Sequence, residues 1–228
     1  MTAPTNEHPE TCALASSPCL LNELRPDGTV PVDPEQSRDV ARWRKSERER
    51  LIRARGLLSQ EYRSQQTIAI VAGIEQILAD GPLAQATISV YWPIRAEPDL
   101  RPWMHSLAQR KLRVALPLAM ALGRPLSFRE WHPHARLARG LWSIPYPAEG
   151  AVLTPDVVIA PVVGFDEACY RLGYGGGFFD RTLAAMTPKP LTIGIGYPEA
   201  VLRTIFPQPH DIRMDWIVTG SSGPVRAG

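Results

Sequence analysis

Residues 166–181 read Asp-Glu-Ala-Cys-Tyr-Arg-Leu-Gly-Tyr-Gly-Gly-Gly-Phe-Phe-Asp-Arg, with four glycines in five residues and charged side chains on both sides. The apolar run 157–163 precedes this stretch, and residues 178–186 after it have helical spacing. A buried strand, a glycine loop and a helix in that order can bring backbone N–H groups and a helix N-terminus to one anion. The stretch predicts a phosphate-binding loop; a turn whose glycines only permit close backbone packing is the open alternative.

The order of residues in this loop excludes two common nucleotide motifs. A Walker loop needs Lys and then Ser or Thr after its last glycine, whereas Phe178 and Phe179 follow here. A dinucleotide fingerprint also spaces its glycines differently from Gly173, Gly175 and Gly177. The flanking arginine and aspartate still favour a phosphate site, because arginine pairs with phosphate oxygens and aspartate can hold a divalent cation.

Composition bounds the class of protein. The chain has 228 residues, a length that suits one α/β domain. Its formal net charge of +2 is too small for a general nucleic-acid surface. Its three cysteines provide no disulfide framework, and no apolar run approaches a membrane span. The first residues lack the pattern of a signal peptide, and residues 1–32 are rich in Pro, Ser and Thr. We therefore expect a cytoplasmic protein with a disordered leader over 1–32.

Hydrophobic periodicity predicts helices and strands in alternation. The expected helices span 33–56, 59–80, 100–109 and 178–186, and the expected strands span 87–92, 112–117, 127–131, 157–163, 191–197 and 216–219. This order favours a single α/β domain over 33–220, built as three α/β/α layers with a mostly parallel central sheet and a basic N-terminal helix. Residues 221–228 are expected to form a flexible tail. Ligands of such sheets bind at the carboxyl ends of the strands, where the glycine loop falls.

Residues 171–181 resemble the motif of the 5-formyltetrahydrofolate cyclo-ligase family, which typically reads Arg-Leu-Gly-x-Gly-Gly-Gly-Tyr-Tyr-Asp-Arg. Further landmarks extend the resemblance over roughly residues 40–220. In order, they are a basic first helix ending in Leu-Ser, Glu-x-Asp after the first strand, Val-Ala-Leu-Pro, an Ile-Pro-x-Pro turn, and Pro-His-Asp near the end. Several landmarks in order are more specific than one glycine pattern.

The resemblance implies ATP- and Mg²⁺-dependent cyclisation of 5-formyltetrahydrofolate to 5,10-methenyltetrahydrofolate, with release of ADP and phosphate. In this family the γ-phosphoryl group moves to the formyl oxygen, N10 attacks the activated carbon, and phosphate leaves. Such chemistry depends on positioning and charge neutralisation more than on a protein nucleophile. The implied partners are reduced folate and ATP, with no membrane and no nucleic acid, and the chain is expected to be a monomer.

The resemblance also implies roles for individual residues at the nucleotide end. Arg171 and Asp180 would be catalytic, and Asp180 and Asp211 would bind Mg²⁺. The ATP-binding set would be Arg44, Lys45, Arg48, Arg171, Leu172, Gly173, Tyr174, Gly175, Gly176, Gly177, Phe178 and Phe179. The alignment leaves open whether Arg44 or Lys45 takes the first role. The alternatives are a solvated basic helix face, a first-turn carboxylate at Asp180 favoured by the helix dipole, and a turn residue at Asp211.

The folate end rests on aromatic residues and one carboxylate. By the same resemblance the folate-binding set would be Trp92, Glu97, Trp142, Tyr174 and Phe178. A carboxylate suits the donor groups of a pterin, and aromatic walls suit a flat ligand. The alternatives are core tryptophans and an ordinary exposed glutamate.

The chain departs from the family pattern at several positions. Tyr146 stands where many members have Glu or Gln, Leu100 replaces a Thr, Gly220 replaces a common Glu, and a Phe pair replaces two tyrosines. These changes keep open a second hypothesis, a catalytically impaired member that acts as a folate, nucleotide or RNA-binding protein. A third is an isomerase or acyltransferase on a similar scaffold, because fold alone does not fix activity.

Overall fold

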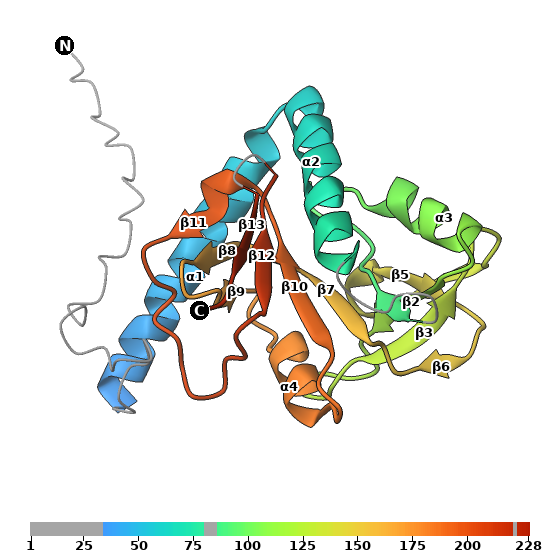
Figure 1. Cartoon of the computed structure of the whole chain (residues 1–228). Coiled ribbons are helices and arrows are strands. Elements are labelled where there is room, and N and C mark those ends of the chain that lie inside the picture. Colours follow the sequence, from blue (N-terminus) through green and yellow to red (C-terminus); the bar gives the residue numbers. More distant parts are fainter. Residues whose placement is uncertain (1–33, 80–85, 221–222) are drawn as a thin grey trace, which may run out of the picture.

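A computed structural model describes residues 34–79, 86–220 and 223–228 (Figure 1). The leader predicted over 1–32 lies outside these residues. The main sheet has eight strands in the order β13-β12-β10-β7-β1-β2-β3-β6. Their bounds are β1 (Thr87–Ser89), β2 (Arg113–Leu118), β3 (Ser127–Trp131), β6 (Val152–Leu153), β7 (Val157–Pro161), β10 (Leu191–Ile195), β12 (Trp216–Val218) and β13 (Pro224–Arg226).

The centre of this sheet is parallel and its edges are antiparallel. The pairs β2–β1, β1–β7, β7–β10 and β10–β12 are parallel. The pairs β2–β3, β3–β6 and β12–β13 are antiparallel. The predicted mostly parallel α/β sheet is therefore confirmed, with its parallel part where buried apolar runs were read from the sequence.

Helices cover both faces of the sheet (Figure 1). One face holds α2 (Gln60–Ala79) and α3 (Arg101–Gln109), and the other holds α4 (Phe178–Ala185). The side chains of β7 alternate accordingly: Ile159 packs in the cluster that contains α2 and α3, whereas Val158 and Ala160 pack with Leu183 of α4. This alternation is the strand period of two, and it produces the predicted three layers.

The first two helices follow the predicted signals closely. α1 (Pro34–Leu57) runs along one side of the domain, and its Trp43 packs edge-on against Phe206 with ring centroids 4.9 Å apart. Ser59 caps α2 by accepting the Tyr62 N–H at 3.1 Å. Ile70 and Ile74 of α2 are fully buried, as their spacing predicts. None of the described helices is long and apolar enough to cross a membrane.

Two small sheets complete the described structure. β4 (Leu137–Arg139) pairs with β5 (Pro145–Pro147), and β8 (Gly164–Asp166) lies between β9 (Arg171–Leu172) and β11 (Val201–Leu202). Short 3-10 turns occur at η2 (Leu141–Ser143) and η3 (Pro198–Ala200). The predicted domain boundary at 220 needs a correction: β13, inside the expected flexible tail, pairs with β12 and so belongs to the sheet.

Candidate active site

A cavity of about 540 Å³ opens where the carboxyl ends of β1, β2 and β7 meet α1 and the glycine loop. Its size is that of an ordinary small-molecule site. Of the residues predicted for the site, the cavity is lined by Arg44, Arg48, Trp92, Glu97, Trp142, Arg171, Leu172, Gly173, Tyr174, Gly175, Gly176, Gly177, Phe178, Phe179, Asp180 and Asp211. Lys45 is not among the lining residues and is exposed. The phase of α1 therefore turns Arg44, and not Lys45, toward the cavity.

The glycine loop connects β9 to the N-terminus of α4. Gly175 and Gly177 have φ values of 91° and 61°, in the left-handed region that favours glycine. A Cβ atom at Gly173 would lie 2.7 Å from Nη1 of Arg171, and one at Gly177 would lie 2.7 Å from Nη1 of Arg181. These glycines thus allow both close packing and the approach of two guanidinium groups to the loop, so the two interpretations of the motif are compatible.

Arg171 and Asp180 bracket this loop with a buried ion pair. Nη2 of Arg171 lies 3.0 Å from Oδ2 of Asp180, and the guanidinium stacks 5.1 Å above the Phe179 ring centre. Both Nε and Nη2 of Arg171 are buried without a hydrogen-bond partner, so the ion-pair contact does not have hydrogen-bond geometry. Buried guanidinium N–H groups rarely stay unsatisfied. Arg171 also lines the cavity beside the glycine loop, so an anionic ligand bound there would meet an arginine residue.

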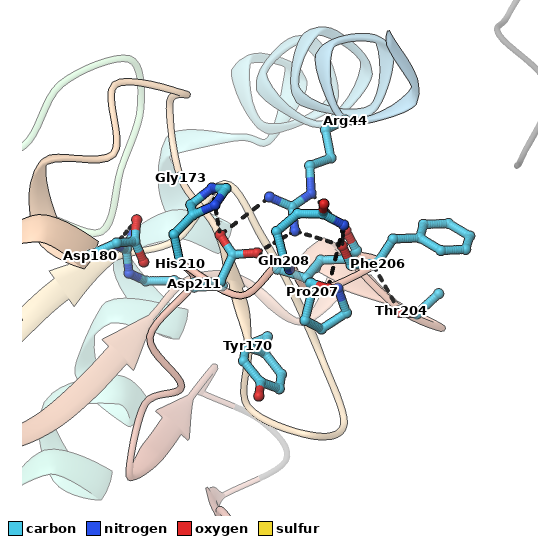
Figure 2. Close-up of polar contacts among 12 residues, drawn as sticks. Arg44, Tyr170, Gly173, Asp180, Thr204, Phe206, Pro207, Gln208, His210 and Asp211 are labelled. Carbon is cyan, nitrogen blue, oxygen red and sulfur yellow. Dashed lines mark hydrogen bonds and ion pairs between the residues drawn. The ribbon is translucent and has the colours of Figure 1, made fainter. Parts of the chain in front are cut away.

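A second buried pair joins Arg44 of α1 to Asp211 (Figure 2). Nη2 and Nη1 of Arg44 lie 2.5 Å and 3.2 Å from the two carboxylate oxygens. Arg44 also donates to the carbonyl oxygens of Ile205 and Phe206, both at 2.8 Å, and Asp211 accepts the Gln208 N–H at 2.6 Å. This bidentate pair with its added backbone bonds fixes the loop that follows β11 against α1.

Asp180 reaches the same loop from α4. Its Oδ1 accepts the Ile212 N–H at 3.2 Å, and in the view of Figure 2 Asp180 and Arg44 lie on opposite sides of Asp211. His210 is exposed, with its Nε2 3.9 Å from Oδ1 of Asp211. The two carboxylates predicted to bind metal therefore line one cavity, although each already contacts an arginine.

The donor set fits a weakly coordinated cation. In the described part of the chain no three His, Cys, Asp or Glu side chains gather as a metal site. Mg²⁺ keeps several waters and usually takes only one or two protein carboxylates together with substrate phosphates. Asp180 and Asp211 satisfy that requirement within one cavity.

Arg48 supplies a further cation beside the glycine loop. Its Nε donates to the carbonyl oxygen of Gly173 at 2.7 Å. Burial, followed by the nearby charge of Arg44, lowers the pKa of Arg48. The guanidinium still stays protonated at physiological pH, and an anionic ligand beside it would offset the cost of its burial.

Glu97 lines the same cavity, on the segment that follows β1. The side chain is buried, and burial raises its pKa above the usual range. Its Oε2 accepts the Ile94 N–H at 2.8 Å, and its Oε1 accepts the hydroxyl proton of Tyr174 at 2.7 Å. The interpretation of Glu97 as an ordinary exposed carboxylate is therefore wrong. Buried at a strand end, it presents hydrogen-bond acceptors to the cavity.

Sequence reasoning missed one residue of this cluster, Arg55. It is buried in α1, and its Nη2 lies 2.5 Å from the hydroxyl oxygen of Tyr174. The signal was helical spacing, because Arg55 follows Arg48 by seven residues and Arg44 by eleven, which places all three on one helix face. A basic helix without its partners does not show which arginine is buried.

Aromatic residues form the wall and mouth of the cavity. Trp142 is 62% exposed and meets Phe178 edge-on with centroids 5.4 Å apart. Trp142 is therefore not a core tryptophan. Trp92 packs against the main core cluster and also lines the cavity, with Arg101 stacked over its ring.

Some departures from the family pattern line the cavity and others lie away from it. Tyr146 lines the cavity, where Arg129 lies 5.6 Å above its ring centre. Leu100 is fully buried in the core, and neither Leu100 nor Gly220 is among the lining residues. A Cβ atom at Gly220 would collide with Gln66. Leu100 and Gly220 therefore have packing reasons away from the cavity, whereas Tyr146 and the Phe178–Phe179 pair line it.

Comparison with known proteins agrees with this arrangement. The model of the 5-formyltetrahydrofolate cyclo-ligase family matches residues 40–220. The 5-formyltetrahydrofolate cyclo-ligase of Mycolicibacterium smegmatis is 30% identical over 148 residues, covering 61% of this chain and 76% of the relative. That of Escherichia coli K12 is 31% identical over 142 residues, covering 59% and 78%.

Solved structures show the same similarity. The NMR structure of Aquifex aeolicus 5,10-methenyltetrahydrofolate synthetase superposes with a TM-score of 0.70 at 26% identity, covering 81% of this chain and 92% of that one. The Mycoplasma pneumoniae 5,10-methenyltetrahydrofolate synthetase, at 23% identity, shares the fold with a TM-score of 0.65 and covers 78% and 99%. With the family model spanning most of the domain and the glycine loop, both ion pairs and Glu97 lining one cavity, the chain belongs to the 5-formyltetrahydrofolate cyclo-ligase family.

Proposed function

We propose that the protein catalyses the ATP- and Mg²⁺-dependent cyclisation of 5-formyltetrahydrofolate to 5,10-methenyltetrahydrofolate, with release of ADP and phosphate. The observation that carries this proposal is the joining of two chemically different ends in one cavity. One end is a glycine loop with buried arginines, and the other holds a buried carboxylate with aromatic neighbours. The glycine loop with its arginines fits a phosphate donor, and the carboxylate with its aromatic neighbours fits a flat ligand rich in N–H groups.

At the nucleotide end, Arg171 and Arg48 bind the phosphates of ATP. Both arginines line the cavity at the glycine loop, and Arg48 uses only its Nε on Gly173. The loop N–H groups and the start of α4 add positive partial charge. These groups neutralise charge on the γ-phosphoryl group during transfer, which lowers the barrier without a protein nucleophile.

Asp180 and Asp211 would hold Mg²⁺ against the same phosphates. When bound, this ion supplies charge neutralisation and fixes the orientation of the phosphate chain. Asp180 has fewer contacts within the protein than Asp211, because Asp211 makes a bidentate pair with Arg44 and also accepts a backbone N–H.

At the folate end, Glu97 accepts hydrogen bonds from the pterin, and Trp142 and Phe178 enclose the ring system at the mouth. The formyl oxygen then faces the glycine loop, where it takes the γ-phosphoryl group and the bond from that phosphorus to ADP breaks. N10 forms a bond to the formyl carbon, the carbon–oxygen bond breaks with loss of phosphate, and N10 gives up its proton. The cavity orients these two reactive groups toward each other.

The direct test mixes purified protein with 5-formyltetrahydrofolate, Mg²⁺ and ATP, and follows the ultraviolet absorbance of the methenyl product. We expect an absorbance rise that requires ATP and Mg²⁺ and that releases one phosphate per product. Absence of an ATP-dependent rise at high enzyme concentration would refute the proposal. In that case, salt-sensitive binding of RNA, or folate binding without turnover, would favour the impaired-member hypothesis.

The departures from the family pattern are divided on that second hypothesis. Tyr146 and the Phe178–Phe179 pair line the cavity, whereas Leu100 and Gly220 do not. Arg44, one of the basic residues that a polyanion would contact, is buried against Asp211. The cytoplasmic location and the monomeric state expected from the sequence stay predictions.

A further inference from the structure

We propose that Arg55 is a positioning residue, which orients Glu97 toward the substrate through the hydroxyl group of Tyr174. The inference rests on the proposed use of Glu97 in folate binding. It adds a residue of α1 to the folate end, although the helix was expected to serve only the nucleotide end.

Arg55 is a buried cation with no carboxylate partner. It is 7% exposed, and no ion pair to Arg55 occurs in the described residues. Its Nε donates to the carbonyl oxygen of Arg95 at 3.0 Å, and its Nη2 donates to the Tyr174 hydroxyl at 2.5 Å. Removing a guanidinium from water without a counter-charge is costly. Nη1 of Arg55 also contacts the carbonyl oxygen of Val162 at 3.5 Å, and the Tyr174 hydroxyl is the contact that leads on to a carboxylate, Glu97.

The direction of the hydrogen bonds follows from the chemistry of the donors. A guanidinium has no acceptor, so the Tyr174 oxygen must accept from Arg55. The phenolic proton is then free for Oε1 of Glu97, 2.7 Å away. Burial raises the pKa of Tyr174, which keeps the phenol protonated as a donor. The chain runs from Arg55 through Tyr174 to Glu97 in one direction.

This chain holds Glu97 in a defined orientation. One carboxylate oxygen accepts from Tyr174 and the other accepts from the Ile94 N–H at 2.8 Å. Each oxygen keeps a lone pair for a ligand N–H. The charge of Arg55 also opposes the rise that burial causes in the pKa of Glu97. Arg55 thus favours the carboxylate form and fixes its direction.

Tyr174 belongs to the glycine loop, so the same contact ties the loop to the folate end. Arg48 holds the preceding residue from the same helix, through its bond to the Gly173 carbonyl. α1 therefore contacts the loop at two successive residues, Gly173 through Arg48 and Tyr174 through Arg55. Loss of Arg55 removes the contact with Tyr174 and leaves the contact with Gly173.

The test compares Arg55→Met with Arg53→Met, a matched control at an exposed position of the same helix. We expect Arg55→Met to raise the KM for 5-formyltetrahydrofolate about tenfold, while the KM for ATP changes by less than about twofold. Arg53→Met should leave both unchanged. Fluorescence titration of 5-formyltetrahydrofolate without ATP should show the same tenfold loss of affinity, and this readout does not require turnover.

A double-mutant cycle separates positioning from a purely structural role. In a Tyr174→Phe background, which removes the relay, Arg55→Met should cost less than about twofold in folate affinity. Effects that multiply in the double variant, or equal losses for ATP and folate, would overturn the proposal. If Arg55→Met does not fold, the same cycle is run with Arg55→Lys, where a loss of affinity independent of Tyr174 would also overturn it. An inactive wild type that shows this coupling in titration would refute the proposed catalysis and leave the positioning role intact.

Discussion

The two buried arginine–aspartate pairs of the cavity differ in how fully each guanidinium is satisfied. Arg44 binds both oxygens of Asp211 and two backbone carbonyl oxygens. Arg171 contacts only one oxygen of Asp180, and its Nε and Nη2 have no hydrogen-bond partner. Because unsatisfied buried donors are costly, we infer that the first pair stabilises the fold and propose that the second binds a ligand.

The largest effect should come from the incompletely satisfied pair. Arg171→Met keeps most of the side-chain volume and removes the cation that faces the glycine loop. We expect kcat/KM for the cyclisation to fall about 10³-fold, because charge on the transferring phosphoryl group loses a fixed partner. The substitution also leaves the Asp180 carboxylate without its counter-ion, so the free energy of unfolding, measured in urea, should fall. The fall should be smaller than for Arg44→Met, because Arg171 lacks the two backbone hydrogen bonds that Arg44 makes. A large loss of stability with modest loss of rate would reverse the assignment of the two pairs.

Arg44→Met should instead lower the stability of the fold more than the rate of the reaction. The substitution leaves the Asp211 carboxylate buried beside α1 without its counter-ion, and it frees two carbonyl oxygens. We expect the protein to lose about 3 kcal/mol of unfolding free energy. A urea midpoint equal to that of the wild type would contradict the structural role. As the matched control, Arg42→Met changes an exposed residue of the same helix, and it should leave stability within about 0.5 kcal/mol.

The two carboxylates can be compared in the same way. Asp180→Asn should lower kcat about 100-fold and raise the Mg²⁺ concentration needed for half-maximal activity, because one ligand charge is lost. Asp211→Asn should raise that concentration less and destabilise the fold more, since Asp211 is already committed to Arg44. Mg²⁺ titrations of both variants with urea unfolding test this contrast. Equal Mg²⁺ dependence in the two variants would show that both carboxylates serve the ion alike.

The sequence predicted the parallel centre of the fold well and the small sheets poorly. Long apolar runs such as 157–163 need burial on both sides, which identifies them as inner strands. β8, β9 and β11 have two or three residues each, and such short strands are defined by their partners more than by their composition. β13 was missed for the same reason, because its pairing with β12 is tertiary.

For the site, the motif residues were predictable and their contacts were not. The glycine loop determined where Arg171 and Asp180 lie along the chain, and the strand order brought both to the cavity. No local pattern shows that Arg44 is fully satisfied, because its carbonyl partners lie more than 160 residues away. Arg55 was missed likewise, since Tyr174 is 119 residues away. Burial of charge is a property of packing, and a helix sequence shows only which residues share a face.

Glu97 extends the comparison to a buried carboxylate that has no ion pair in the described residues. Burial raises its pKa, while the hydrogen bonds from Ile94 and Tyr174 and the charges of Arg55 and Arg95 lower it; Tyr91 also faces it. In the proposed function the ionised form accepts hydrogen bonds from the folate, so we expect affinity to be retained above the raised pKa and lost as the pH falls through it. The loss should approach tenfold per pH unit below that pKa. We expect fluorescence titrations to show this acidic limb at a higher pH than an ordinary glutamate would give.

Glu97→Gln, which has no proton to gain, should bind more weakly at neutral pH and lack the limb. An acidic limb that persists unchanged in Glu97→Gln would assign the titration to the ligand or to another group, and would leave the folate end without its proposed acceptor.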